Sequence, residues 1–145
     1  MQLTLYADGG ARGNPGPAAI GAVLKDAQGK IVAELSKFIK KATNNQAEYA
    51  ALIFGCEKAL ELGATELKIL LDSKLVVEQV AGRWKIKDLE LRKAVAKTHT
   101  LLAQFKKWEI QHIPRTKNHE ADRLVNSVLN ARGFRKSQLY KRTIF

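Results

Sequence analysis

Residues 6–17 read YADGGARGNPGP, and this glycine-rich stretch decides how the chain begins to fold. The side chains before it alternate between polar and apolar over residues 2–7, which predicts a β-strand. Two glycines follow Asp8, so we expect the strand to end there in a turn. The glycines and prolines of residues 11–17 predict a tight loop. The chain therefore carries an acidic side chain where its first strand is expected to end.

Outward from this stretch, hydrophobic spacing and turn residues predict the other elements. Two further strands joined by a short hairpin turn complete an antiparallel meander, after which helices alternate with strands. The predicted strands are residues 2–7, 20–24, 31–38, 66–71 and 108–113, and the predicted helices are residues 46–62, 73–80, 88–105 and 118–131. This order predicts an α/β domain with a five-stranded mixed sheet, three antiparallel strands first, flanked by helices.

The charge of the chain is its unusual bulk property. Its 145 residues include 25 Lys and Arg against 14 Asp and Glu, a formal net charge of +11. A surplus this large indicates a polyanionic partner, with nucleic acid favoured over an acidic membrane surface. The hydrophobic share of 46% excludes a disordered or fibrous chain, and the length indicates a single domain.

The cellular location is predicted from what the sequence carries. The single cysteine, Cys56, cannot form an internal disulfide, which fits a reducing compartment. The sequence contains neither a secretory signal pattern nor an apolar run long enough for a membrane helix. We therefore expect a cytoplasmic protein without membrane association, and a monomer that needs no protein partner.

Four carboxylates stand where they could meet. Asp8 and Asp72 end the predicted first and fourth strands. Glu48 lies in the first turn of the predicted first helix, and Asp122 lies in the first turns of the last. If the two strands are neighbours, their carboxyl ends bring Asp8 and Asp72 side by side. Taken singly, the four have ordinary interpretations as a turn residue, an N-cap, a helix-dipole partner and a surface ion pair.

Taken together, four converging carboxylates have a different interpretation. Unpaired carboxylates at one point repel one another, and a hard divalent cation with oxygen ligands, such as Mg²⁺, would neutralise them. Two such ions could activate a water molecule and stabilise the leaving oxygen of a phosphodiester. A basic chain with few acids, placed in this way, therefore predicts metal-dependent chemistry on a nucleic acid.

Four sequence blocks, in order and at matching spacing, resemble those of type 1 ribonuclease H: YADGGARGNPGPAAIG, TNNQAEYAAL, LLDSKLVVEQV and NHEADRLVN. The resemblance covers the chain up to about the final helix. It implies the ribonuclease H fold and endonucleolytic hydrolysis of the RNA strand of RNA/DNA hybrids. It also implies two Mg²⁺ ions, with Mn²⁺ as the alternative, and products with 5′-phosphate and 3′-hydroxyl ends.

The resemblance also assigns roles to residues. Asp8, Glu48, Asp72 and Asp122 match the catalytic, metal-binding carboxylates of the family, with Asp8 expected to bridge the ions and Glu48 to lie near the ribose. The residues expected to bind substrate are Asn14, Thr43, Asn44, Asn45, Lys74, Trp84, Arg115 and Asn118. Helix capping is the ordinary interpretation of the polar residues at the helix starts, Asn118 included.

Two departures from the family pattern bear on activity. Many members carry a long basic insertion where this chain has only residues 83–87, RWKIK, so a weaker grip on substrate is expected. Many also carry a mobile Gly-His loop before the last helix, which residues 112–118 lack. Arg115 lies nearest that place and could offer positive charge to the scissile phosphate, but a guanidinium cannot shuttle protons.

The domain division follows from the same blocks. We expect residues 1–131 to form the ribonuclease H catalytic domain and residues 132–145 to form a basic tail. The tail also carries the apolar side chains Phe134, Leu139, Tyr140, Ile144 and Phe145. A purely charged tail would lack these, so part of it is expected to dock on the domain, with a frayed terminus as the alternative.

Two other functions stay open at this point. A different nuclease on the same fold, such as a resolvase, integrase or exonuclease, would share the carboxylates and the metals. The block TNNQAE and Asn14 resemble hybrid readers and favour the ribonuclease. A non-catalytic nucleic-acid binding module would be expected to lose at least one metal ligand, and this sequence keeps all four.

Overall fold

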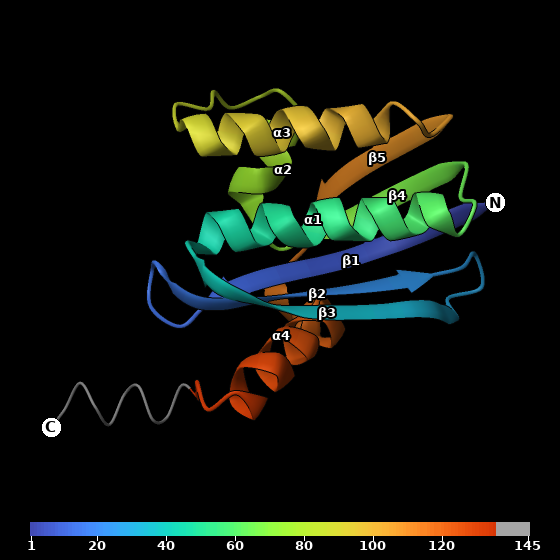
Figure 1. Ribbon diagram of the computed structural model, residues 1–145. Helices are drawn as coiled ribbons and strands as arrows, with labels where there is room; N and C mark the ends of the chain where they lie inside the picture. Colours follow the sequence, from blue (N-terminus) through green and yellow to red (C-terminus); the bar gives the residue numbers. More distant parts are fainter. Residues whose placement is uncertain (136–145) are drawn as a thin grey trace, which may run out of the picture.

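The computed structural model describes residues 1–135 and shows helices on both faces of a central β-sheet (Figure 1). Within these residues the elements are β1 (Gln2–Ala11), β2 (Gly16–Lys25), β3 (Ile31–Ala42), α1 (Asn44–Glu61), β4 (Glu66–Leu71), α2 (Lys74–Val80), α3 (Leu89–Leu102), β5 (Lys107–His112), the short 3-10 helix η1 (Arg115–Lys117) and α4 (His119–Ala131). None of the helices in this part of the chain is both long and apolar enough to cross a membrane.

The sheet has five strands in the order β3-β2-β1-β4-β5. The first three strands pair antiparallel, while β1 with β4 and β4 with β5 pair parallel. The predicted α/β fold, a mixed sheet with an antiparallel meander first, is therefore confirmed. Because β1 and β4 are neighbours in register, with Ala7 beside Leu71, the residues that follow them meet at one edge of the sheet.

The two faces of the sheet are covered differently. Figure 1 shows α1 and α3 on one face and α4 on the other. The main core lies under α1, where Leu5, Leu52 and Ile69 are fully buried. The face under α4 carries a smaller apolar cluster built on Ala19, Val125 and Leu129.

The first strand does not end at Asp8, so the predicted turn there is wrong. Strand β1 continues through Gly9 and Gly10 to Ala11, paired with β2 throughout. The glycine is needed for another reason, since a Cβ placed at Gly9 would lie 2.2 Å from the carbonyl carbon of Ala47 in α1. Strands β2 and β3 are likewise longer than predicted. The extensions of β1 and β2 shorten the predicted loop of residues 11–17 to residues 12–15.

The helices begin and end close to the predicted positions. Helix α1 begins two residues earlier than predicted, because Thr43 and Gln46 form a reciprocal capping box: Thr43 Oγ1 accepts from the Gln46 N–H at 3.1 Å, and Gln46 Oε1 accepts from the Thr43 N–H at 2.9 Å. Helix α3 ends at Leu102 rather than at residue 105, and η1 was not predicted.

The start of the basic tail packs against the sheet. The Phe134 ring lies parallel to that of Phe38 in β3, with centroids 6.1 Å apart and an interplanar angle of 3°. The Phe134 N–H donates to the Leu129 carbonyl at 2.8 Å. The other apolar tail residues, Leu139, Tyr140, Ile144 and Phe145, lie outside the described residues.

Candidate active site

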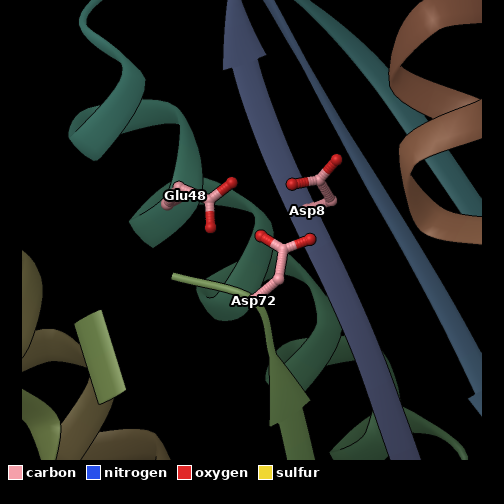
Figure 2. A group of neighbouring side chains, drawn as sticks. All are labelled: Asp8, Glu48 and Asp72. Carbon is pink, nitrogen blue, oxygen red and sulfur yellow. The ribbon is translucent and has the colours of Figure 1, made fainter. Parts of the chain in front are cut away.

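Three carboxylates from different parts of the fold point toward one another (Figure 2). Asp8 lies on β1, Glu48 on α1 and Asp72 directly after β4. One oxygen of each lies within 4.8 Å of one oxygen of each of the others. Asp8 and Glu48 are buried, while Asp72 is partly exposed. The parallel pairing of β1 with β4 produces this cluster, as the sequence predicts for neighbouring strands.

Local structure leaves these carboxylates free of their ordinary roles. The N-cap of α2 is Ser73, whose Oγ accepts from the Val76 N–H at 3.3 Å, so Asp72 does not cap this helix. Glu48 is the fifth residue of α1, one turn further in than the predicted first turn, because the helix starts at Asn44. Its Oε1 accepts from the Gly9 N–H at 2.6 Å, which joins α1 to β1 at the site.

The cluster concentrates negative charge in a buried place. Burial, followed by the charges of Glu48, Asp72 and Asp122, raises the pKa of Asp8 to about 10. Burial also raises the pKa of Glu48 to about 7, although hydrogen bonding to Asp8 and to the Gly9 N–H limits the rise. Such shifts are typical of functional sites, and they mean that a bound cation would favour the ionised forms.

Asp122 approaches from the opposite face of the sheet. It lies on α4 and lines the same cavity of about 350 Å³ as Asp8, Glu48 and Asp72. It is outside the tight group of three, but its charge contributes to the raised pKa of Asp8. Its Oδ2 accepts a hydrogen bond from Asn126 Nδ2 at 3.1 Å. The structure therefore brings all four predicted carboxylates to one cavity, three of them in close contact.

Asn118 does not use its side chain as a cap, which corrects one sequence interpretation. It occupies the N-cap position of α4, but Nδ2 donates instead to the Ala7 carbonyl at 2.9 Å and to Asp72 Oδ2 at 3.2 Å. The side chain is buried, and its Oδ1 has no hydrogen-bond partner among the described residues. Asn118 thus joins the β1 backbone at Ala7 to the Asp72 carboxylate.

The polar residues of the glycine-rich loop and the start of α1 are joined to each other. Asn44 Oδ1 accepts from the Ala11 N–H at 2.9 Å, and the Asn44 N–H donates to Asn14 Oδ1 at 3.0 Å. Asn44 also lines the cavity. Thr43 caps α1 as described above, and Asn45 is exposed in its first turn. The predicted substrate-binding residues of this region therefore lie together beside the carboxylates.

The remaining predicted binding residues fall into two places. Arg115, in η1, lines the cavity, and its charge lowers the pKa of Glu48 against the effect of burial. Lys74 and Trp84 do not line the cavity; Lys74 Nζ lies 6.0 Å from the centroid of the Trp84 ring, which is 44% exposed. All three histidines lie outside the cavity lining, and His99 contacts the Val80 carbonyl at 2.8 Å.

Arg12 and Asn126 were missed by the sequence reasoning, although both line the cavity. Arg12 is 8% exposed, which is unusual for a guanidinium. Two sequence signals could have indicated them. Arg12 is the one charged residue inside the glycine-rich loop, and Asn126 lies four residues after Asp122, on the same face of the helix.

Comparison with known proteins identifies the family of this chain. A family model described as "Reverse transcriptase-like" matches residues 6–128. The crystal structure of RNase H1 from the halophilic archaeon Halobacterium salinarum is 44% identical, with a TM-score of 0.89, and the match covers 90% of this chain and 99% of that one. The chain belongs to the type 1 ribonuclease H family. The predicted family is thereby confirmed.

Two other ribonuclease H relatives bear on the substrate and on the length of this chain. LC11-RNase H1, solved in complex with an RNA/DNA hybrid, is 41% identical with a TM-score of 0.82, over 86% of this chain and 94% of that one. The bifunctional protein Rv2228c of Mycobacterium tuberculosis is 48% identical over 132 residues, which is 90% of this chain. This chain spans only 36% of the length of that curated relative.

Proposed function

We propose that this protein is a metal-dependent endoribonuclease that hydrolyses the RNA strand of RNA/DNA hybrids. The observation that carries the proposal is the gathering of Asp8, Glu48 and Asp72 oxygens within 4.8 Å of one another in a chain of net charge +11. A polyanionic substrate is attracted by the surplus charge, whereas the carboxylates would repel it unless cations neutralise them. The hybrid bound by LC11-RNase H1 supports the choice of substrate.

The residues present fit a divalent cation. Carboxylate oxygens are the hard ligands that Mg²⁺ prefers, and Mn²⁺ accepts the same set. The raised pKa values of Asp8 and Glu48 reflect burial first and neighbouring carboxylates second, and a bound cation would favour the ionised forms. Asp8, Glu48, Asp72 and Asp122 would hold two Mg²⁺ ions, with Mn²⁺ as the alternative. Two ions held there would supply an activated water and stabilise the leaving oxygen, a chemistry that would leave 5′-phosphate and 3′-hydroxyl ends.

The chain's own residues orient the substrate around this centre. Asn14, Thr43, Asn44 and Asn45 would contact a phosphate of the DNA strand or base edges in the minor groove. The start of α1 favours such an anion because a helix N-terminus carries a partial positive charge. Glu48 would accept a hydrogen bond from a ribose 2′-hydroxyl, the group that distinguishes RNA from DNA. Strand choice and chemistry would then share one side chain.

The other side chains act at the edges of the site. Arg115 offers a positive charge beside Glu48, where a scissile phosphate would lie. Asn118 keeps Asp72 oriented through its Nδ2 hydrogen bond. The Trp84 ring and Lys74 form an exposed aromatic and cationic surface that could follow the DNA backbone. These side chains would bind the substrate in place of the basic insertion that longer members of the family carry.

The setting of the activity follows from the same proposal. Cys56 is a buried free thiol, which suits a reducing cytoplasm. We expect the protein to act there as a monomer, without an obligatory protein partner.

The proposal is tested with end-labelled RNA/DNA, RNA/RNA and DNA/DNA duplexes, each with and without Mg²⁺. Cleavage of the RNA strand of the hybrid alone, lost on removal of metal and in Asp72→Asn, is the expected result. Asp26→Asn is the matched control, because Asp26 lies in the exposed hairpin turn and an Asn there can accept the same N–H groups of Gln28 and Lys30. Metal-independent cleavage, or hybrid binding without cleavage, would contradict the proposal.

A further inference from the structure

We propose that Arg12 and Asn126 are positioning residues for Asp122, and that the carbonyl of Phe134 holds Arg12 in place. The start of the C-terminal segment would thereby set the geometry of the fourth carboxylate. This inference rests on the proposed function, since it assigns Asp122 to the metal-binding cavity. It concerns how the chain's own residues prepare that cavity.

A continuous chain of hydrogen bonds connects these residues. Arg12 Nε donates to the Phe134 carbonyl at 2.9 Å, and an Arg12 terminal nitrogen donates to Asn126 Oδ1 at 2.7 Å. Asn126 Nδ2 then donates to Asp122 Oδ2 at 3.1 Å. These hydrogen bonds link the Phe134 carbonyl to the cavity. Arg12 is 122 positions from Phe134 and 114 positions from Asn126 in the sequence.

The direction of this chain is fixed by chemistry. A guanidinium only donates, so Asn126 must turn its oxygen toward Arg12. The amide nitrogen of Asn126 then faces Asp122 and donates to its carboxylate. An ionised carboxylate can accept hydrogen bonds but cannot donate them. Without Arg12, the Asn126 amide could rotate and present its oxygen to Asp122, which would repel the carboxylate. Arg12 therefore decides which atom of Asn126 Asp122 meets.

Arg12 is itself held on both sides. Its backbone N–H donates to the Pro17 carbonyl at 2.8 Å, and a Cβ at Gly16 would lie 2.1 Å from the Arg12 carbonyl oxygen, so the loop closes tightly around it. A buried guanidinium is costly unless it is hydrogen-bonded, and the Phe134 carbonyl and Asn126 Oδ1 accept from two of its nitrogens here.

The segment that carries Phe134 is anchored to β3. The Phe134 ring lies parallel to Phe38, and the Arg132 guanidinium carbon lies 4.1 Å from the centroid of the same Phe38 ring. Phe38 is therefore the point on the sheet to which residues 132–134 are fastened. The carbonyl that accepts from Arg12 owes its position to these ring contacts.

The test uses two measurements. Mg²⁺ alone is titrated into the protein and followed by NMR at the backbone amides of Asp8 and Asp122. In a separate assay, the Mg²⁺ concentration that gives half-maximal cleavage of the hybrid is determined. Arg12→Met and Asn126→Ala should each weaken Mg²⁺ binding and raise the half-maximal concentration about tenfold, the usual effect of losing a group that orients a metal ligand. The double variant should bind Mg²⁺ no more weakly than the weaker-binding single variant, because both residues act through the same series of hydrogen bonds. A chain that ends at Gly133 should show a smaller effect in the same direction.

Two controls separate positioning from loss of stability. Asn130→Ala removes the same amide one turn further along α4, where it is exposed, and should leave Mg²⁺ binding unchanged. Val128→Ala weakens the packing of α4 and should lower the melting temperature without changing the Mg²⁺ titration. If the Arg12 and Asn126 variants also lose only thermal stability, the inference is overturned.

The outcome also distinguishes this inference from the proposed function. A wild-type protein that binds Mg²⁺ at Asp122, more tightly than its variants, but cleaves no hybrid supports the inference and contradicts the function. If the wild-type protein cleaves the hybrid and the variants need no more Mg²⁺ than it does, the function is supported and the inference is contradicted. If the wild-type protein responds to neither Mg²⁺ nor Mn²⁺, both are wrong.

Discussion

Glu48 and Asp122 reach one cavity from opposite faces of the sheet, on helices that are held in different ways. Helix α1 lies on the main core and buries Tyr49, Leu52 and Cys56 along its length. Helix α4 buries only Ala121, Val125 and Leu129 and lies over the smaller cluster. A buried large apolar side chain contributes about 1.5–3 kcal/mol, so α1 is the more firmly held of the two.

The difference shows how one site can combine a fixed part with an adjustable part. The pairing of β1 with β4 and the packing of α1 place Asp8, Glu48 and Asp72 as a consequence of the fold. Asp122 depends on a few apolar contacts and on hydrogen bonds through Asn126. We expect substitutions on the α1 side to act through folding or chemistry directly, and those on the α4 side to act through metal affinity.

The largest effect is expected at Asp8, where the two sides meet. Asp8→Asn should lower the turnover number for hybrid cleavage by about 10³-fold or more, equivalent to about 4 kcal/mol in activation free energy, because it removes the most central charge. Single-turnover kinetics at saturating Mg²⁺ measure this. The same variant should melt at a higher temperature than the wild type in metal-free buffer at pH 8, since Asp8, whose pKa rises to about 10 on folding, must take up a proton to fold and an Asn need not. Retention of more than a tenth of the activity would break the account of the cluster.

The packing of the two helices can be compared with one added methyl group on each side. A Cβ at Gly9 would lie 2.2 Å from the Ala47 backbone of α1, and one at Gly21 would lie 2.5 Å from the Ala121 carbonyl oxygen of α4. Gly9→Ala and Gly21→Ala should each lose at least about 1–3 kcal/mol in urea unfolding, and Gly9→Ala should lose more because it displaces the helix of the main core.

Gly10→Ala is the matched control for that pair. A Cβ at Gly10 would meet Val125 Cγ1 at 3.6 Å, an ordinary contact, so the free energy of unfolding should hardly change. Equal losses for Gly9→Ala and Gly21→Ala would show that the two faces are held equally well.

The buried charge on the α1 side predicts how stability varies with pH. Folding raises the pKa of Glu48 from 4.5 to about 7 and that of Asp8 from 3.8 to about 10, so the folded state holds these protons more tightly than the unfolded state. The stabilisation is complete below about pH 4 and is lost as pH rises through the folded pKa values. The metal-free protein should therefore melt at a lower temperature at pH 8.5 than at pH 5.5. Glu48→Gln should reduce this slope, and Mg²⁺ should raise the melting temperature at pH 8.5. A melting temperature that rises between these two pH values in metal-free buffer would contradict the assignment.

The smallest effect is expected at Arg115, at the edge of the cavity. Arg115→Gln should lower turnover only a few-fold, because the residue adds charge but holds no metal. It should also raise the pKa of Glu48 in the metal-free protein, since the Arg115 charge lowers it, and a titration of the Glu48 carboxyl carbon by NMR would detect this. Arg115→Lys should keep most of the turnover. A complete loss in Arg115→Gln would place Arg115 within the chemistry itself.

The sequence predicted the carboxylates because their positions depend on local order. Asp8 follows Ala7 and Asp72 follows Leu71, and the parallel pairing of Ala7 with Leu71 is enough to bring the two carboxylates together. The strand ends were harder to predict. Gly9 and Gly10 indicate a turn in sequence, but in the fold both lie in β1, and Gly9 allows α1 to approach the sheet. That closeness depends on residues some 38 or more positions away, which no local pattern reveals.

The polar residues around the cluster show the same limit. Asn118 was predicted to bind substrate, with helix capping as its ordinary interpretation. Its side chain does not cap but donates to the Ala7 carbonyl and to Asp72, because both lie within its reach only after the sheet has formed. Arg12 and Asn126 were missed since their contacts join the loop after β1 to α4 and the C-terminal segment. The prediction of a site from sequence was therefore good for its ligands and poor for what supports them.

The central claim is that the four carboxylates serve the attack of water on the RNA strand of a hybrid, and isotope-labelled water tests it most directly. The protein is incubated with Mg²⁺ and an RNA/DNA hybrid in ¹⁸O-labelled water for a single turnover, and the RNA fragments are analysed by mass spectrometry. Water attack predicts one ¹⁸O atom in a 5′-phosphate end, a 3′-hydroxyl on the other fragment, and no product with Asp8→Asn. A 2′,3′-cyclic phosphate without ¹⁸O would show attack by the ribose hydroxyl instead, and would contradict the account.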